Sequence, residues 1–347
     1  MLTNAIQNKK FNSRVKSVPA SRAFCLARPV WLISFAIMFN KLLCSVTVFV
    51  LVASAAVAAP TSKKQILFFT KSSGFEHSVI SWKGGRPSYA EKVLMEIGTQ
   101  QGWEFTFSKD GSKFSRDYLA QFDAVFFYTS GDLSSPGTDK QPPITSEGKQ
   151  ALFDYIRSGR GFIGTHSASD TYHTDNESKK GPERYVNHGE KADPYVRFLG
   201  CEFIKHGAQQ VATNTVTDPK FPGFGKLGPT YAFHEEWYSL KDFTPDVHVL
   251  SVIDAPAMKG VEYKRPPYPN TLARQEGAGR VWYTAMGHRE DVWTNPIFQQ
   301  ILIGGTKWAL GEIKAEVPAN LKETAPGAYT NPPYVEPKAA TPKPKAR

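Results

Sequence analysis

Continuous apolar runs alternate with amphipathic segments in the first half of the chain. Each apolar run ends at a loop of polar residues and glycine. Such runs are typical of strands that are buried on both faces of a parallel sheet. Between them, apolar residues recur at the spacing of one helical face, which predicts strand–helix–strand units. The predicted strands are residues 65–70, 103–108, 124–128 and 162–165, and the predicted helices are residues 88–101 and 145–158.

The second half of the chain has a different pattern. Proline, glycine and polar residues dominate residues 171–194, which is typical of a long loop that covers a binding site. Later strands and a hairpin add antiparallel strands to the predicted parallel sheet, and a helix follows them. The predicted strands are residues 210–217, 246–253, 271–275 and 280–285, and the predicted helix is residues 295–310.

The two ends differ from the body, which we expect to span residues 62–322. Residues 1–58 have the order of a leader with a secretory signal peptide, namely basic residues, an apolar run and small residues before Ala59. Met38 is an alternative start for this leader. The apolar run is too short for a membrane span, so we expect a secreted or periplasmic protein with no stable membrane span after processing. Residues 323–347 are rich in proline and lysine, which predicts a disordered tail.

The formal net charge of +10 comes from the two ends of the chain. Residues 1–59 carry seven basic side chains and no acidic one, and residues 331–347 carry four basic and one acidic. Residues 60–330 are therefore formally neutral, with 31 basic and 31 acidic side chains. Because a nucleic-acid-binding domain carries a basic face, this balance argues against a nucleic-acid partner and favours a small-molecule ligand.

Motifs that mark common nucleophiles and nucleotide-binding loops are absent from the sequence. There is no G-x-S-x-G elbow and no P-loop. Cys201 is the one cysteine left after removal of the leader, so no intramolecular disulfide is expected. We interpret Cys201 as a small buried apolar residue.

Three histidines, His77, His166 and His288, each follow a strand-like segment. Ligands bind open α/β sheets at the carboxyl ends of the strands, so these histidines are candidates for one shared site. Histidine there can act as a general base, a metal ligand or a hydrogen-bond donor. No histidine pair has the local spacing of a zinc motif, so a zinc-like divalent metal would need ligands from distant loops. Further candidates are Asp132, Asp170, His173, His234, Glu235 and Glu236.

Several other side chains have ordinary structural interpretations. We expect His248, within an apolar run, to be an exposed strand residue. Trp237 and Tyr238 are either core residues or platforms for a sugar ring. Surface positions are expected for His173, His188 and His206.

Five motifs occur in order between residues 64 and 311. They are Gly74-Phe75-Glu76-His77, Gly161-x-x-Gly164-Thr165-His166-Ser167-Ala168-Ser169-Asp170, Glu235-Glu236-Trp237-Tyr238, Asp246-Val247-His248-Val249-Leu250 and Gly279-Arg280-Val281-x-Tyr283-Thr284-Ala285-Met286-Gly287-His288. Together these motifs resemble the ThuA-like (trehalose utilisation) family. The resemblance identifies residues 62–322 as a ThuA-like domain.

The resemblance implies a class I glutamine amidotransferase-like fold. This is an α/β fold with a flavodoxin-like doubly wound, mostly parallel sheet, here with extra antiparallel strands in the second half. Amidotransferases of this class carry a cysteine at the turn after one strand and a His-x-Glu motif after a later strand. In this chain His166 stands at the turn, and His288-Arg289-Glu290 resembles the later motif. Without the cysteine, glutamine amidotransferase activity is not expected, and the histidines are left for acid–base work or ligand binding.

The family is associated with bacterial use of trehalose and related disaccharides, including 3-keto-sugars. The resemblance therefore implies a secreted protein that acts on a sugar or keto-disaccharide, by proton abstraction beside a keto group or by eliminative cleavage. The expected catalytic residues are His166, His288, Glu290 and Asp170, the expected substrate-binding residues are His77, Asp132, Glu235, Trp237 and Tyr238, and the expected metal ligands are His166, His288 and His77.

Two other functions are compatible with the sequence. A non-catalytic carbohydrate-binding protein would stack sugars on Trp82, Trp237, Tyr238 and Trp293. An accessory protein would instead bind its partners through the tail that is rich in proline and lysine.

Overall fold

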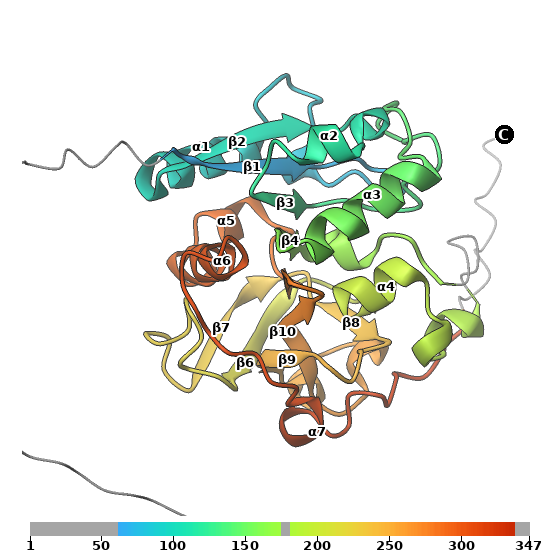
Figure 1. Cartoon of the computed structure of the whole chain (residues 1–347). Helices are drawn as coiled ribbons and strands as arrows, with labels where there is room; N and C mark the ends of the chain where they lie inside the picture. Colours follow the sequence, from blue (N-terminus) through green and yellow to red (C-terminus); the bar gives the residue numbers. More distant parts are fainter. Residues whose placement is uncertain (1–61, 175–180, 337–347) are drawn as a thin grey trace, which may run out of the picture. The chain divides into compact units, whose positions relative to one another are not determined.

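The computed structural model describes residues 62–174 and 181–336. The expected leader, the alternative start at Met38 and the expected cleavage before Ala59 lie outside these residues, as do residues 337–347. The described chain forms a nine-stranded mixed sheet with helices on both sides (Figure 1). Among the described residues, no helix combines the length and apolar character needed to cross a membrane.

The large sheet has the strand order β2-β1-β3-β4-β11-β10-β9-β6-β7. The strands from β2 to β11 pair in parallel, and those from β11 to β7 pair antiparallel. This is a flavodoxin-like doubly wound sheet extended by antiparallel strands, which confirms the expected fold class. The parallel strands are β1 (Lys64–Phe69), β2 (Trp103–Ser108), β3 (Ala124–Phe127), β4 (Gly161–Thr165) and β11 (Gly279–Thr284). The antiparallel strands are β10 (Tyr268–Glu276), β9 (His248–Ile253), β6 (Gln210–Val216) and β7 (Thr230–Glu235).

A second sheet pairs β5 (Glu202–His206) with β8 (Tyr238–Lys241). Neither strand was predicted, and β7 was also missed. They are as long as predicted strands such as β3 and β4, but β5 and β7 mix charged or polar side chains with apolar ones. Such segments lack the continuous apolar run that marks a central strand, although they frame the site described below.

Side-chain caps mark the beginnings of the long helices, and a glycine ends the first of them. Ser88 caps α1 (Tyr89–Gln101) in a capping box with Glu91, and the helix ends at Gly102 in the left-handed conformation. Single side-chain caps, Thr145 and Asn295, begin α3 (Ser146–Arg157) and α6 (Pro296–Ala309). The shorter helices are α2 (Arg116–Leu119), α4 (Pro194–Leu199), α5 (Glu290–Trp293) and α7 (Leu321–Thr324).

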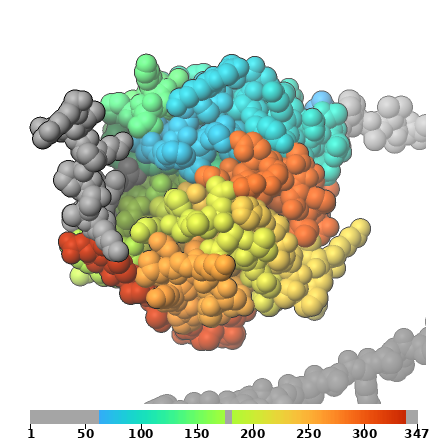
Figure 2. Space-filling model, turned by 180° about the vertical axis from the view of Figure 1, so that it is seen from behind, coloured from blue at the N-terminus to red at the C-terminus, as the bar shows by residue number. Residues whose placement is uncertain are grey.

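Residues 323–336 pack against the body, whereas we expected a disordered tail from residue 323. The guanidinium of Arg265 donates to the backbone carbonyl of Ala328 at 2.7 Å, and the side chain of Asn331 donates to the carbonyl of Tyr185 at 2.7 Å. Composition alone predicted disorder because proline is frequent in this segment. The burial of Ala325 and Ala328 and these two hydrogen bonds fix its backbone instead. Figure 2 shows the red C-terminal segment at the surface of the folded chain.

The contact between α6 and β11 is close because Gly305 has no side chain. A Cβ atom at Gly305 would lie 2.2 Å from the fully buried indole of Trp282. The helix therefore approaches the sheet at van der Waals distance beneath the strand that leads to His288.

We predict that G305A lowers the free energy of unfolding by about 1–3 kcal/mol, because the added methyl group overpacks this contact. An exposed helical glycine would show the opposite sign, since alanine favours helix by up to about 1 kcal/mol. Urea unfolding measures the difference, with G84A as the control because nothing lies within 4 Å of a Cβ added at Gly84. Equal stability of G305A and the parent protein would contradict the prediction.

Candidate metal and acid–base site

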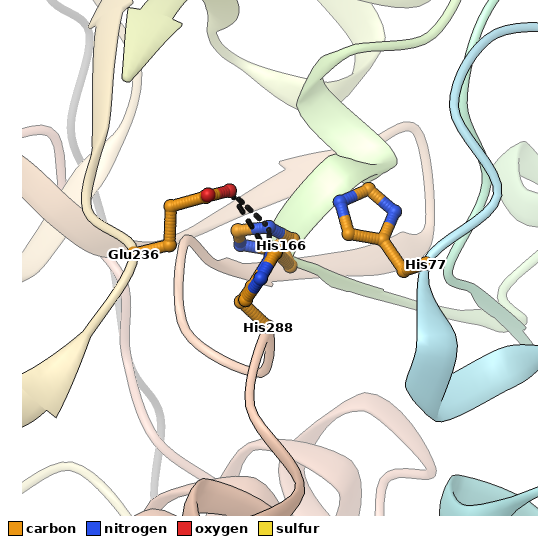
Figure 3. Close-up of side chains that lie close together, drawn as sticks. All are labelled: His77, His166, Glu236 and His288. Atoms are coloured by element: carbon orange, nitrogen blue, oxygen red, sulfur yellow. Dashed lines mark hydrogen bonds and ion pairs between the residues drawn. The ribbon is translucent and has the colours of Figure 1, made fainter. Parts of the chain in front are cut away.

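Four side chains from four separate loops point toward one another at one edge of the sheet (Figure 3). They are His77, His166, Glu236 and His288, called here the histidine cluster, and their potential ligand atoms all lie within 4.8 Å of one another. The structure thus brings together the three histidines that follow predicted strands and adds one carboxylate. His166 comes directly after β4, and Glu236 comes directly after β7.

Two hydrogen bonds fix His166, one at its backbone carbonyl and one at a ring nitrogen, and its backbone adopts an unusual conformation. Its φ angle of 45° lies in the left-handed region, which costs a residue with a side chain roughly 1–2 kcal/mol. The hydroxyl of Tyr283 donates to the carbonyl of His166 at 2.9 Å. Nδ1 of His166 lies 3.0 Å from the carbonyl oxygen of Ala285, so Nδ1 carries the proton and Nε2 keeps its lone pair. Anchoring of one ring nitrogen in this way is typical of histidines that bind metals through the other.

Three potential ligand atoms have the spacing of a metal-binding shell. Nε2 of His166 lies 3.2 Å from Nδ1 of His288. Oε2 of Glu236 lies 3.0 Å from Nδ1 of His288 and 3.6 Å from Nε2 of His166. Ligands that surround one zinc-like ion tetrahedrally at about 2.0–2.1 Å lie roughly 3.3 Å from one another. The residues therefore fit a divalent metal without rearrangement of these three atoms.

His77 completes the cluster with a second buried imidazole. Its ring lies 4.9 Å from the ring of His166 and 5.2 Å from that of His288, centroid to centroid. Within the described residues, Nδ1 of His77 has no hydrogen-bond partner. A buried nitrogen without a partner costs free energy, so a ligand is the natural partner for this atom.

Burial and one carboxylate set the charges of the cluster. Burial lowers the pKa of His77 and of His166, which favours the neutral imidazole that binds metals. Burial would raise the pKa of Glu236, but the neighbouring imidazoles of His166 and His288 outweigh it and hold that pKa well below its usual range. Burial would likewise lower the pKa of His288, and the hydrogen bond to Glu236 raises it instead. The cluster therefore contains one carboxylate charge shared among imidazoles.

Glu235 and Tyr238 fix the position of cluster residues by hydrogen bonds to the His288 loop and by packing against the His166 ring. Oε2 of Glu235 accepts the backbone N–H groups of Gly287 and His288 at 2.8 and 3.1 Å, and burial raises the pKa of Glu235 to about 7. The Tyr238 ring packs 4.0 Å from the His166 ring, and its hydroxyl lies 3.4 Å from Nε2 of His77. Both side chains are buried, so they position the cluster and do not line an open pocket.

The other expected site residues do not belong to the cluster. Oε1 of Glu290 accepts the hydroxyl of Ser78 at 2.6 Å, which ties the His288 loop to the His77 loop. The carboxylate of Asp132 instead accepts hydrogen bonds from its own loop. Trp237 is fully buried, and its indole donates to the carbonyl of Gln210 at 2.8 Å, which makes it a core residue.

Asp170 belongs to a neighbouring buried network. Its Oδ1 lies 2.7 Å from Nε2 of His173 and 2.9 Å from the guanidinium of Arg184. Nδ1 of His173 lies 2.7 Å from Oε1 of Glu202. His173 was expected at the surface, but it is buried because acidic groups flank both ring nitrogens. Asp170 and His173 therefore anchor the long loop to β5.

A second acidic group, made of His188, Glu202 and Asp242, also has metal-ligand spacing. The ammonium of Lys241 lies 3.5 Å from Glu202, 3.2 Å from Asp242 and 3.3 Å from Nδ1 of His188. This buried lysine supplies the positive charge that a metal would bring. The histidine cluster, whose neighbours include no such cation among the described contacts, is the better metal site.

Two other candidate histidines lie apart from the cluster. His234 is exposed on β7, on the face opposite Glu235. His248, expected to be exposed, is buried on β9 with Nε2 3.0 Å from Asp218 and Nδ1 2.7 Å from the carbonyl of Pro318. Its strand is interior to the sheet and the segment after α6 covers it, so the apolar neighbours in sequence indicated burial correctly and the expectation for this side chain was wrong.

A pocket of about 540 Å³ lies beside the cluster. His206 lines this pocket, and its Nδ1 lies 3.3 Å from Oε1 of Glu236. Phe75 also lines it and packs edge-on against His77, with ring centroids 5.0 Å apart. A larger hollow of about 890 Å³ lies between α2 and α3, and none of its lining residues has a described contact with the cluster, whereas His206 and Phe75 of the smaller pocket do. The chemistry therefore points to the smaller pocket.

Both glutamates were candidates in the sequence, but we expected Glu235 to be the binding residue, whereas Glu236 is the one that contacts the imidazoles. Glu235 is the last residue of β7 and Glu236 follows it, so the two carboxylates point in different directions. Glu235 reaches the backbone N–H groups of the His288 loop, and Glu236 reaches the imidazoles. His206 was considered only as a surface residue because β5 was not predicted.

A family model described as ThuA, trehalose utilisation, matches residues 65–309. The chain belongs to the ThuA family. Two solved structures share the fold. A ThuA-like protein from Bacteroides uniformis is 17% identical with a TM-score of 0.54, and covers 76% of this chain and 98% of its own. A ThuA-like protein from Parabacteroides merdae is 18% identical with a TM-score of 0.50, and covers 79% of this chain and 98% of its own. No curated protein matches the chain.

We predict that H173Q destabilises this ThuA-family protein most between pH 4.5 and pH 6.5, the ordinary pKa values of Glu and His. Burial would raise the pKa of Glu202, but hydrogen bonding lowers it to about 2, so its contribution is present above pH 4.5 and is lost toward pH 2. Burial would lower the pKa of His173, but its acidic partners raise it, so its contribution is complete below pH 6.5 and is lost as pH rises through the raised value.

Within that window the loss should be about 3 kcal/mol, typical of breaking a buried ion pair. Arg184 and Lys241 remain to neutralise part of the acidic charge. Urea unfolding at several pH values measures the difference in free energy of unfolding between H173Q and the parent protein. H234Q is the control, because the side chain of His234 is exposed on β7. A difference that does not change with pH would contradict the assigned ionisation.

Proposed function

We propose that this ThuA-family protein is a secreted enzyme that acts on a sugar or keto-disaccharide with a divalent metal held by the histidine cluster. The observation that carries the proposal is the 3.0–3.6 Å spacing of Nε2 of His166, Nδ1 of His288 and Oε2 of Glu236. Secretion rests on the signal-like composition of the leader, and the sugar substrate on the family description.

The donor set suits a zinc-like ion. His166, His288 and Glu236 would hold it, and His77 offers a further nitrogen; imidazole and carboxylate ligands are those that zinc takes in catalytic sites. A bound divalent ion would polarise a carbonyl or hydroxyl oxygen of the substrate. The protein supplies the rest, since Glu235 holds the His288 loop by two backbone N–H groups and Ala285 fixes the ring of His166.

We assign proton transfer to His206, a histidine that contacts the cluster and lines the pocket. Its Nδ1 faces Glu236 and the carbonyl of Gly207, so Nδ1 carries the proton and Nε2 is the basic atom. Nε2 would accept the proton beside a keto group of the substrate, and the imidazolium would return that proton to the departing glycosidic oxygen. The carboxylate of Glu236 stabilises the imidazolium, as carboxylates do in histidine dyads.

Burial argues against a purely sugar-binding protein that uses the expected aromatic platforms. Trp237, Tyr238 and Trp293 are all buried, so none of these three presents a face to a sugar. The fourth expected platform, Trp82, is half-buried, and the guanidinium of Arg86 lies over its ring, 4.1 Å from the centroid. The formally neutral body continues to argue against a nucleic-acid partner.

We predict one divalent ion per chain in the purified protein, lost in H166A and in H288A, because each change removes a ligand. Elemental mass spectrometry after incubation with zinc and dialysis measures this content. H234A is the matched control, since His234 precedes the same two glutamates but is exposed on the other face of β7. Full metal content in H166A and H288A would refute the metal site.

We predict that H206N lowers kcat on a keto-disaccharide by about 10²–10⁴-fold, the usual contribution of a general acid–base group, and leaves the metal content unchanged. H288A should lose both turnover and metal. Product formation with a 3-keto-disaccharide provides the assay, and H234N controls for loss of a histidine nearby. Unchanged turnover in both H166A and H288A would overturn the mechanism.

A further inference from the structure

The pocket beside the cluster has walls from three distant parts of the chain. Phe203 and His206 belong to β5, Tyr185 to the long loop, and Tyr334 to the C-terminal segment, here defined as residues 327–336. Its volume of about 540 Å³ lies within the roughly 300–1,000 Å³ range of small-molecule pockets. Neither the family description nor the chemistry of the cluster accounts for it.

Aromatic rings supply much of the pocket surface. Tyr185 and Tyr334 meet edge to face with centroids 5.4 Å apart. The ring of Phe203 packs 4.0 Å from that of Tyr238, which in turn packs against His166. Phe75 is 66% exposed at the border between pocket and cluster. The exposed ring of Phe75 is therefore an apolar surface that is free to contact a ligand. A planar aromatic ring can stack against the C–H face of a sugar ring.

The charges at the rim select a neutral ligand. The guanidinium of Arg184 pairs with Asp170 at 2.9 Å, and the ammonium of Lys205 pairs with Glu262 at 3.4 Å. Each cation thus already has an acidic partner, so the rim offers hydrogen-bond donors and acceptors without a surplus of positive charge. A polyhydroxylated neutral molecule matches this surface better than a phosphate or an acidic sugar.

The pocket also adjoins the cluster closely enough for one ligand to reach both. His206 contacts Glu236, and Phe75 contacts His77. We infer that the pocket is a binding subsite for a neutral second sugar unit, attached to the unit that reacts at the cluster. The inference rests on the proposed function for the identity of the reacting unit, but the subsite itself can bind without turnover.

The C-terminal segment is then part of the binding site. Asn331 donates to the carbonyl of Tyr185, and Asn187 donates to the carbonyl of Tyr329, both at 2.7 Å. These bonds hold Tyr334 against the pocket. Tyr329 lies on the same segment, is 46% exposed and is not among the pocket residues, so the two tyrosines form a matched pair for substitution.

The test is calorimetric titration of the full chain with trehalose, glucose and glucose 6-phosphate. We expect trehalose to bind the parent protein and Y329A equally, and Y334A and Y185A about tenfold more weakly, as for loss of one aromatic contact. Glucose should bind more weakly than trehalose, and its affinity should change less in Y334A. Thermal melting confirms that each variant is folded, and metal content should be the same in all.

Equal trehalose affinity in the parent protein, Y334A and Y185A would overturn the subsite. Tighter binding of glucose 6-phosphate than of trehalose would overturn its neutral character. Affinity that depends on Tyr334 in a protein that binds no metal would leave the subsite standing while the proposed function fails, so the two failures are distinguishable.

Discussion

The parallel pairing of β4 with β11 is the constraint on which the site depends. Thr165 pairs with Thr284 at the ends of the two strands, so the next residues, His166 and Ala285, emerge together at the same edge of the sheet. The left-handed turn at His166 then directs the ring toward the carbonyl of Ala285. Without this register, the ring would lose its anchor and His288 would emerge elsewhere.

Electrostatics adds a second level of organisation. One carboxylate, Glu236, contacts three imidazoles through its two oxygens, those of His166, His206 and His288. Burial opposes charge on every member, so the cluster holds its carboxylate only because each oxygen has an imidazole partner. The contacts with these imidazoles allow a polar group of this size to persist inside the fold.

The sequence predicted the parallel core well because continuous apolar runs and helix caps are local signals. The runs before His77, His166 and His288 indicated where these side chains emerge, and the order of an α/β sheet placed them near one another. The choice of Glu236 over Glu235 and the role of His206 depend on β5 and β7, whose patterns are weak. Asp132, Asp170 and Trp237 were chosen by proximity in sequence to loop or strand ends, but their contacts form through partners that no local pattern reveals. The packed tail escaped prediction because its proline content outweighed two buried alanines.

Glu235 and Glu236 are consecutive, yet one holds the backbone of the His288 loop and the other contacts its side chain. Insertion or deletion of one residue within β7 would exchange their faces and reverse both roles at once. The connection between β6 and β7 carries no such requirement. Among ThuA-family proteins with this arrangement, length variation should therefore accumulate in that connection. The length of the strand itself should stay constant, because it sets the position of the two glutamates relative to the site.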